Sequence, residues 1–261
     1  MKVCALGDCC IDYYQDSGRY YPTGNAVDFA VHMRRLGYPV SLISAVGRDS
    51  YGSQTKKFLE KEKIDLSHLK TSPGKTAVTM MDLIDGDRIH SDYEEGVLQT
   101  LHYSSRDIEF ARSHDLVHSV LWGKGEGILS KVKREDNTLT FDFADRLDSP
   151  LIQEIVPTVD HGFFSYHKGE DKWIKSYLEN QCASGLKTAV ATFGEKGSMA
   201  LTKEGFVFQE SLSVEVVNTV GAGDAFIAGF SHGLLKGLSV KECLYEGTKI
   251  ASQVVTRFEP Y

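Results

Sequence analysis

The residues best suited to chemistry in this sequence lie within the stretch 218–224. A β-rich run is predicted to end at Thr219, and a helix is predicted to begin at Ala222. Gly221, Ala222 and Gly223 carry little or no side chain, so their backbone amides can converge on one point. Because unpaired N–H groups and the dipole at a helix N-terminus favour an anion, the pattern predicts an anion hole at this turn.

Asp224 follows these small residues and lies in the first turn of the predicted helix. One interpretation is an acidic residue that stabilises the helix through its dipole, by about 0.3–1 kcal/mol. The other is a general base that takes a proton from an attacking hydroxyl while the amides hold the developing phosphoryl charge. The motif is not a dinucleotide-binding fingerprint, because Phe226 stands where the third glycine would be, and the sequence contains no P-loop.

The elements that must position these residues alternate along the chain between short β-rich runs and segments with helical periodicity. This alternation predicts one α/β domain over residues 1–261, with a mostly parallel sheet covered by helices on both faces. Ligands of such sheets bind at the carboxyl ends of the strands. The predicted strands are 2–7, 40–46, 115–119, 139–143, 162–165 and 188–193; the predicted helices are 25–36, 52–61, 106–112, 171–183, 222–236 and 241–256.

Residues 75–93 interrupt this alternation. The apolar runs 75–84 and 88–93 flank Asp85-Gly86-Asp87, a strong hairpin turn signal. The hairpin is either a flap that stands off the main sheet or a plain edge hairpin. A flap with an apolar face would pair across a two-fold axis, so we expect a homodimer formed through it.

Composition and charge exclude several classes of protein. The net charge of −7 and the lack of basic runs exclude binding of nucleic acid through a broad basic surface. No apolar run approaches the roughly 18 residues that a membrane-spanning helix needs. The five cysteines show no Cys-x-x-Cys spacing, which favours reduced thiols and a cytoplasmic location. Nine histidines show no metal-binding spacing, so we expect hydrogen-bonded or solvated histidines instead.

With these motifs the sequence resembles a known family, the ribokinase/PfkB carbohydrate kinases. The resemblance rests on the motif 218–229 and extends over nearly the whole chain. It implies a ribokinase-like, Rossmann-type core with a mostly parallel central sheet and a small β lid, formed by residues of about 13–22 and 76–97. The other matching motifs are Gly7-Asp8 with Asp12, Thr23-Gly-Asn-Ala-Val-Asp28, Leu36-Gly37, Val46-Gly-Arg-Asp49 and Thr192-Phe-Gly-Glu-Lys-Gly197.

The resemblance implies that the protein transfers the γ-phosphoryl group of ATP to a primary hydroxyl, with Mg²⁺ bridging the phosphates. Asp224 would be the general base, and the amides of residues 221–223 would form the anion hole. A monovalent cation such as K⁺ near the anion hole is also implied. The family's Asn-x-x-Glu element is absent near residues 164–168, so the protein contacts of Mg²⁺ stay unassigned; Glu170 is a nearby downstream carboxylate.

Two groups of binding residues are implied by the same resemblance. Carboxylate and amide side chains suit a row of sugar hydroxyls, although Asn25 equally suits a helix cap. Asp28, Tyr93 and Glu95 equally suit a solvent-facing surface. The implied acceptor-binding residues are Asp12, Gly24, Asn25, Asp28, Tyr93 and Glu95, and the implied nucleotide-binding residues are Thr192, Gly194, Gly197 and Asn218.

Within the family, five segments resemble the branch that phosphorylates fructoselysine at its 6-hydroxyl: 24–27, 92–97, 122–123, 141–143 and 148–150. Asp28 replaces the family's usual asparagine, and its carboxylate can pair with a cationic sugar-amine such as a glycated lysine. The alternatives are another acceptor (fructose, a keto-deoxy sugar acid or a nucleoside) or a catalytically silent sugar- or nucleotide-binding protein. Few basic residues lie near Asp12, Asn25 and Asp28 in the sequence, which argues against an acidic acceptor.

Overall fold

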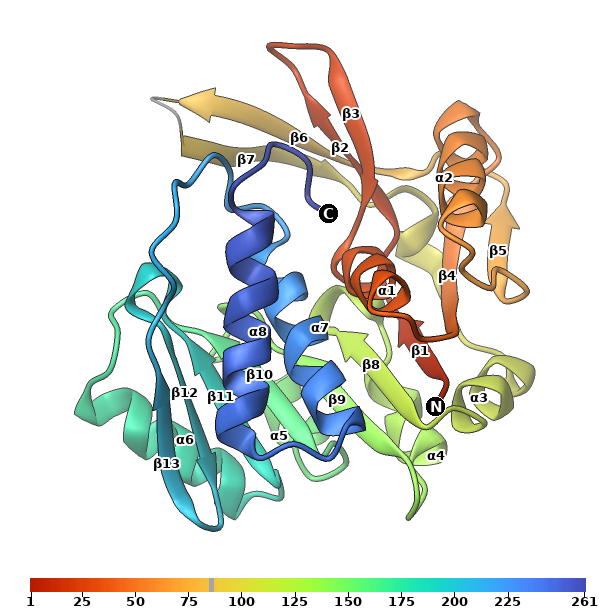
Figure 1. Ribbon diagram of the computed structural model, residues 1–261. Coiled ribbons are helices and arrows are strands. Elements are labelled where there is room, and N and C mark those ends of the chain that lie inside the picture. The colour runs from red at the N-terminus through yellow and green to blue at the C-terminus, as the bar shows by residue number, and fades with distance from the viewer. Residues whose placement is uncertain (85–86) are drawn as a thin grey trace.

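The computed structural model describes residues 1–84 and 87–261. Its main sheet has nine strands in the order β13-β12-β11-β10-β9-β8-β1-β4-β5 (Figure 1). The pairs from β11 through to β5 are parallel, and β12 and β13 extend one edge antiparallel. The predicted α/β fold with a mostly parallel sheet is confirmed. The strands are β1 Val3–Leu6, β4 Val40–Gly47, β5 Leu69–Ser72, β8 Leu116–Val120, β9 Thr138–Asp142, β10 His161–Ser165, β11 Thr188–Thr192, β12 Ser198–Thr202 and β13 Gly205–Gln209.

Helices cover both faces of this sheet because its strands bury alternate side chains in opposite directions. On β1, Val3 and Ala5 join one apolar core, and Cys4 and Leu6 join the other. The first core is shared with α1 Asn25–Arg35, α2 Ser50–Lys61, α7 Ala222–Leu235 and α8 Val240–Val254. The second is shared with α3 Ser105–Arg112, α4 Leu129–Val132, α5 Leu151–Ile155 and α6 Lys172–Ala183. Short 3₁₀ turns are η1 Gly96–Thr100, η2 Leu121–Gly123, η3 Glu126–Ile128 and η4 Gly194–Lys196.

A second, four-stranded sheet in the order β3-β2-β6-β7 stands off the main sheet (Figure 1). Its β2–β6 pair is parallel and the other two pairs are antiparallel. The predicted hairpin is therefore present, although its turn residues 85–86 lie outside the described residues. Asp12, an implied acceptor-binding residue, lies within β2. The strands are β2 Cys10–Tyr14, β3 Arg19–Thr23, β6 Ala77–Ile84 and β7 Asp87–Glu94.

The predicted β-rich run before Thr219 is wrong. Residues 210–217 form no strand, and Val216 and Val217 are more than half exposed. β-branched residues suit a strand only where a neighbouring strand supplies hydrogen bonds, and here the N–H groups of Val217 and Asn218 both donate to the Val255 carbonyl instead. None of the helices in the described part of the chain has the length and apolar character needed to cross a bilayer.

Candidate active site

The N-termini of α1 and α7 meet beside the carboxyl end of β1. The Asn25 amide Nδ2 donates to the Asp224 Oδ1 at 3.1 Å and so joins the two helices. Asp8, just after β1, accepts the backbone N–H of Asn25 at 3.1 Å and of Ala26 at 3.2 Å. Asp8 thereby supplies the cap that Gly24 cannot, because Gly24 occupies the N-cap position of α1 without a side chain. The first turn of α1 is thus fixed against the predicted base.

The predicted anion hole lies at the N-terminus of α7. Gly221 has a φ of 77°, and a Cβ on it would lie 2.6 Å from the Pro260 carbonyl oxygen, so only glycine fits there. The Ala222 N–H donates to the Thr219 carbonyl at 3.2 Å. Within the described residues, no acceptor is found for the N–H groups of Gly221 and Gly223. A Cβ on Gly223 would meet no heavy atom within 4 Å, so open space lies in front of it.

Asp224 is buried, with an exposed fraction of 6%. Burial raises the pKa of its carboxyl well above the ordinary value, and the charges of Asp142 and Asp8 raise it further. The hydrogen bond from Asn25 opposes this rise because it stabilises the ionised form. A carboxylate with a raised pKa is a stronger proton acceptor than an ordinary aspartate. Its environment therefore suits the predicted general base.

Asp224 belongs to an acid cluster, which we define as five buried aspartates, each at most 8% exposed. Asp28, on α1, shows the effect of this crowding: burial raises its pKa well above the ordinary value, followed by the charges of Asp224, Asp12 and Asp8. The Asp28 Oδ1 is buried with no hydrogen-bond partner among the described residues. The cluster consists of Asp8, Asp12, Asp28, Asp142 and Asp224.

Two members of the acid cluster, Asp8 and Asp142, were not among the predicted site residues. Asp142 ends β9, in the middle of the sheet, and its Oδ1 accepts the Ala144 N–H at 2.9 Å. Burial raises the pKa of Asp142 to about 6, opposed by that hydrogen bond. The available signal was position, since Asp8 and Asp142 each stand at the carboxyl end of a predicted strand, where ligands of parallel sheets bind.

The small sheet brings two predicted acceptor residues to the edge of the site. Tyr93, on β7, is 46% exposed. Burial raises the pKa of its phenol, and the nearby Cys10 and Asp8 raise it further, which places Tyr93 near the acid cluster. Glu95 forms an ion pair with Lys124 at 2.7 Å. Its carboxylate is therefore engaged by the loop after β8, and its contact with an acceptor stays a prediction.

The predicted nucleotide-binding residues gather at the end of β11. Thr192 is the last residue of that strand. Gly194 begins the turn η4 and Gly197 follows it, with φ angles of 61° and 92°. A Cβ on Gly197 would lie 2.2 Å from the Gln209 carbonyl oxygen, whereas one on Gly194 would meet nothing within 4 Å. Gly197 therefore serves the packing of β13, and Gly194 faces open space that a ligand can use.

Asn218, predicted to bind nucleotide, has its side chain engaged within the protein. Its Nδ2 donates to the Phe258 carbonyl at 2.5 Å, and its Oδ1 accepts the Val220 N–H at 3.0 Å. The side chain is buried, with 4% exposure. These contacts fix the turn that leads into Gly221, so the structure gives Asn218 a positioning part. A direct contact with nucleotide stays a prediction.

The described residues contain no group of three or more histidines, cysteines and acids that could enclose a metal ion. Magnesium does not need one, because it keeps several waters and takes one or two carboxylates together with substrate phosphates. Glu170, the downstream candidate, pairs with Lys175 at 2.5 Å. Asp142 fits better, since among the described residues it forms no ion pair with a lysine, arginine or histidine and stands in the acid cluster.

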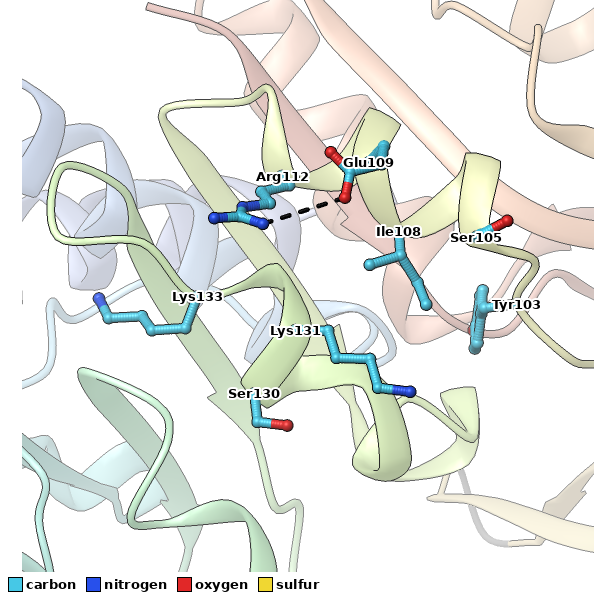
Figure 2. Close-up of a pocket in the computed structure, with 8 residues that line it drawn as sticks. All are labelled: Tyr103, Ser105, Ile108, Glu109, Arg112, Ser130, Lys131 and Lys133. Atoms are coloured by element: carbon cyan, nitrogen blue, oxygen red, sulfur yellow. Dashed lines mark ion pairs between the residues drawn. The ribbon is translucent and has the colours of Figure 1, made fainter.

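A hollow of about 590 Å³ opens elsewhere, between α3 and the segment around α4 (Figure 2). It includes none of the predicted site residues. The only carboxylate that lines it, Glu109, pairs with Arg112 at 3.9 Å. The one carboxylate of this hollow is thus exposed, unlike the buried Asp224. Its lining residues are Tyr103, Ser105, Ile108, Glu109, Arg112, Ser130, Lys131 and Lys133.

Comparison of the sequence with known proteins identifies its family. The family model described as pfkB family carbohydrate kinase matches residues 2–261. The fructoselysine 6-kinase of Escherichia coli is 36% identical over 256 residues, which cover 98% of each chain. The fructosamine kinase FrlD of Bacillus subtilis is 29% identical over 234 residues, covering 88% of this chain and 82% of that protein.

The fold comparison agrees. The structure of Arabidopsis thaliana ribokinase, complexed with ribose and ATP, superposes with a TM-score of 0.85 over 98% of this chain and 92% of that one. Sequence identity to that structure is 19%, so the likeness concerns the fold alone. The expected ribokinase-like α/β fold is confirmed.

Proposed function

We propose, because this chain belongs to the pfkB family of carbohydrate kinases, that it phosphorylates the 6-hydroxyl of fructoselysine or of a related fructosamine. The coarser part is established: the chain is an ATP-dependent phosphotransferase of that family. The observation that carries the proposed chemistry is Asp224, held by Asn25 at 3.1 Å beside two glycine amides with no described acceptor. The identity of 36% to a fructoselysine 6-kinase supports the acceptor.

In the proposed reaction, the 6-hydroxyl oxygen attacks the γ-phosphorus of ATP. The new O–P bond forms as the bond to the β–γ bridging oxygen breaks, ADP leaves, and the hydroxyl proton passes to Asp224. A general base of this kind contributes about 10²–10⁴-fold to the rate. The N–H groups of Gly221 and Gly223 stabilise the charge that develops on the transferred group, and one such donor contributes about 10²–10³-fold.

The acid cluster supports an acceptor that carries a positive charge. Asp8, Asp28, Asp142 and Asp224 form no ion pair with a lysine, arginine or histidine in the described part of the chain. A neutral sugar would leave these buried carboxylates to repel one another, whereas a fructosamine carries an amine that is protonated at neutral pH. Asp28, with one buried oxygen unpartnered, is the proposed contact for that ammonium group.

Kinases of this family use ATP with Mg²⁺. We propose that Asp142 holds the ion through its water shell, together with the ATP phosphates. The bound ion would neutralise phosphate charge during transfer. We also propose a stimulating K⁺ ion near Gly221, which the family resemblance supports. The corresponding measurement is turnover in potassium chloride against choline chloride at equal ionic strength.

Two further properties belong to this proposal. A homodimer formed through the small sheet would cover its outward-facing residues, and sedimentation or light scattering of the purified protein would measure its mass. We also propose a cytoplasmic location, because an ATP-dependent kinase meets its nucleotide there and all five cysteines are free thiols. Fractionation of cells that express the protein would test the location.

The acceptor is tested with purified protein, ATP and Mg²⁺ against fructoselysine, fructose, ribose, a keto-deoxy sugar acid and a nucleoside. We expect fructoselysine to give the highest kcat/KM, with a 6-phosphate product identified by mass spectrometry and phosphorus NMR. Turnover of fructose at an equal or higher kcat/KM would overturn the amine assignment. Binding of ligands without ATP consumption for any acceptor would show a silent binding protein.

The matched control is Asp28→Asn, which keeps the shape of the side chain and removes its charge. We expect this variant to lose affinity for fructoselysine and to keep its affinity for fructose. An equal loss for both acceptors would show that Asp28 binds a hydroxyl group or only supports the fold, and would remove the ammonium contact from the proposal.

A further inference from the structure

Residues 258–261, which we call the strap, contact the turn that leads into the anion hole. The Phe258 carbonyl accepts the Asn218 Nδ2 hydrogen at 2.5 Å. The Pro260 carbonyl approaches Gly221 so closely that an added Cβ would lie 2.6 Å from its oxygen. The strap therefore fixes the path of the chain on which the Gly221 and Gly223 amides depend.

The same segment contacts the small sheet. The ring of Phe258 lies 5.2 Å from that of Tyr14 and 6.1 Å from that of Tyr21, measured between centroids. The guanidinium of Arg19 lies over the Phe258 ring at 5.4 Å. These contacts reach both β2 and β3, and β2 carries Asp12 of the acid cluster. Figure 1 shows the C-terminal segment passing between α8 and the base of these two strands.

Tyr261 extends the strap to the junction of β3 and α1. Its hydroxyl donates to the Pro22 carbonyl, two residues before Gly24. Its ring stacks on Phe58 of α2 at 5.1 Å and 20°, and Arg35 of α1 lies over it at 5.4 Å. The side chain is buried, with 8% exposure. The β3–α1 junction supplies Gly24 and Asn25, so Tyr261 anchors the part of the chain that presents the acceptor-binding residues.

Contacts from α1 complete this connection. His32 on α1 is buried, which lowers the pKa of its ring to about 4, and an interaction with the backbone of Pro260 opposes that shift. Burial raises the pKa of the Tyr261 phenol, and the charge of Asp28 on α1 raises it further. The strap thus touches the anion-hole turn near the end of the chain, and the small sheet and α1 near its start.

We infer that the strap positions the acceptor-binding residues relative to the anion hole, with Tyr261 as a positioning residue for the β3–α1 junction. The inference depends on the phosphotransferase activity of the chain and not on the identity of the acceptor. Its physical basis is that a phosphoryl group and a hydroxyl react only when both are held in line. Here the acceptor-binding residues come from the start of the chain and the anion hole from near its end, and the strap contacts both.

The kinetic test compares Tyr261→Ala with wild type, using fructoselysine as acceptor. We expect the acceptor KM to rise about tenfold or more and the KM for ATP to change less than about twofold. Tyr261→Phe keeps the stacking on Phe58 and loses the bond to Pro22, so we expect a rise of about two- to tenfold. Tyr245→Ala is the matched control, because Tyr245 is an exposed tyrosine on α8, and its KM values should match wild type.

Hydrogen exchange tests the strap without any acceptor, so it stays informative if fructoselysine is not turned over. We expect Tyr261→Ala to speed amide exchange about tenfold or more in both β3 and residues 218–224, with Tyr245→Ala unchanged. If Tyr261→Ala does not fold, the same comparison uses Tyr261→Phe and Tyr261→Leu. Unchanged exchange in both segments, or equal rises in both KM values, would overturn the inference.

Discussion

A buried aspartate lies at each end of β9, and the two have opposite surroundings. At its carboxyl end, Asp142 lies in the acid cluster, and burial raises its pKa to about 6. At its amino end, Asp160 accepts the Leu139 N–H at 2.8 Å and pairs with Lys133 and Lys187, and these partners hold its pKa below the ordinary value in spite of burial. Lysines of the protein neutralise Asp160, whereas Asp142 has no such partner among the described residues and would need a bound ligand or ion to neutralise it.

This difference separates stability from function. A depressed pKa means that the folded state favours the charged carboxylate, so Asp160 stabilises the protein at neutral pH. A raised pKa means that the folded state disfavours the charge, so the acid cluster costs stability at neutral pH. Folds retain such a cost where a ligand or a reaction needs it. The carboxyl edge of the sheet is therefore the functional edge. Variants there should lose mainly turnover, and variants at the amino edge should lose mainly stability.

The largest expected effect is that of Asp224→Asn. Turnover should fall about 10²–10⁴-fold, because the amide keeps the shape of the carboxylate but cannot accept the hydroxyl proton. The free energy of unfolding at pH 7 should stay the same or rise, since one crowded charge is removed. Steady-state kinetics and urea unfolding measure the two quantities. A variant with nearly wild-type turnover would show that Asp224 is not the base.

Asp160→Asn should show the reverse pattern. The free energy of unfolding should fall by about 1–3 kcal/mol, because the charged hydrogen bonds to Lys133 and Lys187 are lost. Turnover should match wild type. The loss should be full at neutral pH and should shrink as pH falls through the depressed pKa of Asp160, where the wild-type carboxylate is itself protonated. A large loss of turnover in a folded variant would contradict the separation of the two edges.

The pH profile gives a smaller effect. The ratio kcat/KM should fall as pH falls through the raised pKa of Asp224, because the base becomes protonated. Asp142→Asn removes a negative neighbour of Asp224, so this limb should move to lower pH by about 0.5–1 unit. The position of the limb is independent of any loss in turnover that the variant also causes. A limb that stays in place would show that Asp142 does not act on the base.

The smallest effect is expected for Lys187→Ala. Lys187 pairs with Asp160 at 2.8 Å, but its side chain is 70% exposed, and pairs of this kind contribute less than about 1 kcal/mol. Thermal and urea unfolding should therefore place this variant close to wild type and well above Asp160→Asn. If Lys187→Ala were as unstable as Asp160→Asn, the exposed lysine, and not the buried contacts, would be the main partner of Asp160.

The sequence predicted the elements well where periodicity had one physical cause. The apolar residues of α7 and the apolar run of β4 predicted a helix and a strand correctly, because a sheet covered on both faces must bury such residues. The turn at residues 221–223 was found for a similar reason, since small residues before an acidic helix start have few other uses. The run before Thr219 misled, because β-branched residues do not reveal whether a partner strand exists.

For Asp8 and Asp142, the only signal in the sequence was their position at the end of a predicted strand. Asp8 caps α1 from the end of β1, so no capping residue stands next to the helix in the sequence to indicate it. Asp142 reads as the last residue of a strand, and only the assembled sheet brings it near Asp224. The strap contacts are aromatic and backbone contacts between distant segments. Sequence patterns describe neighbours along the chain, so they did not reveal these contacts.

The hydrogen bond between Asn25 and Asp224 joins residues that are 199 positions apart. Closing so long a loop carries an entropic cost that only the assembled sheet and helices can offset. During refolding from denaturant, the helical signal should therefore return before turnover does. The recovery of enzymatic activity therefore reports the last stage of folding. A chain arrested before that stage would be compact and largely helical, and it would lack activity.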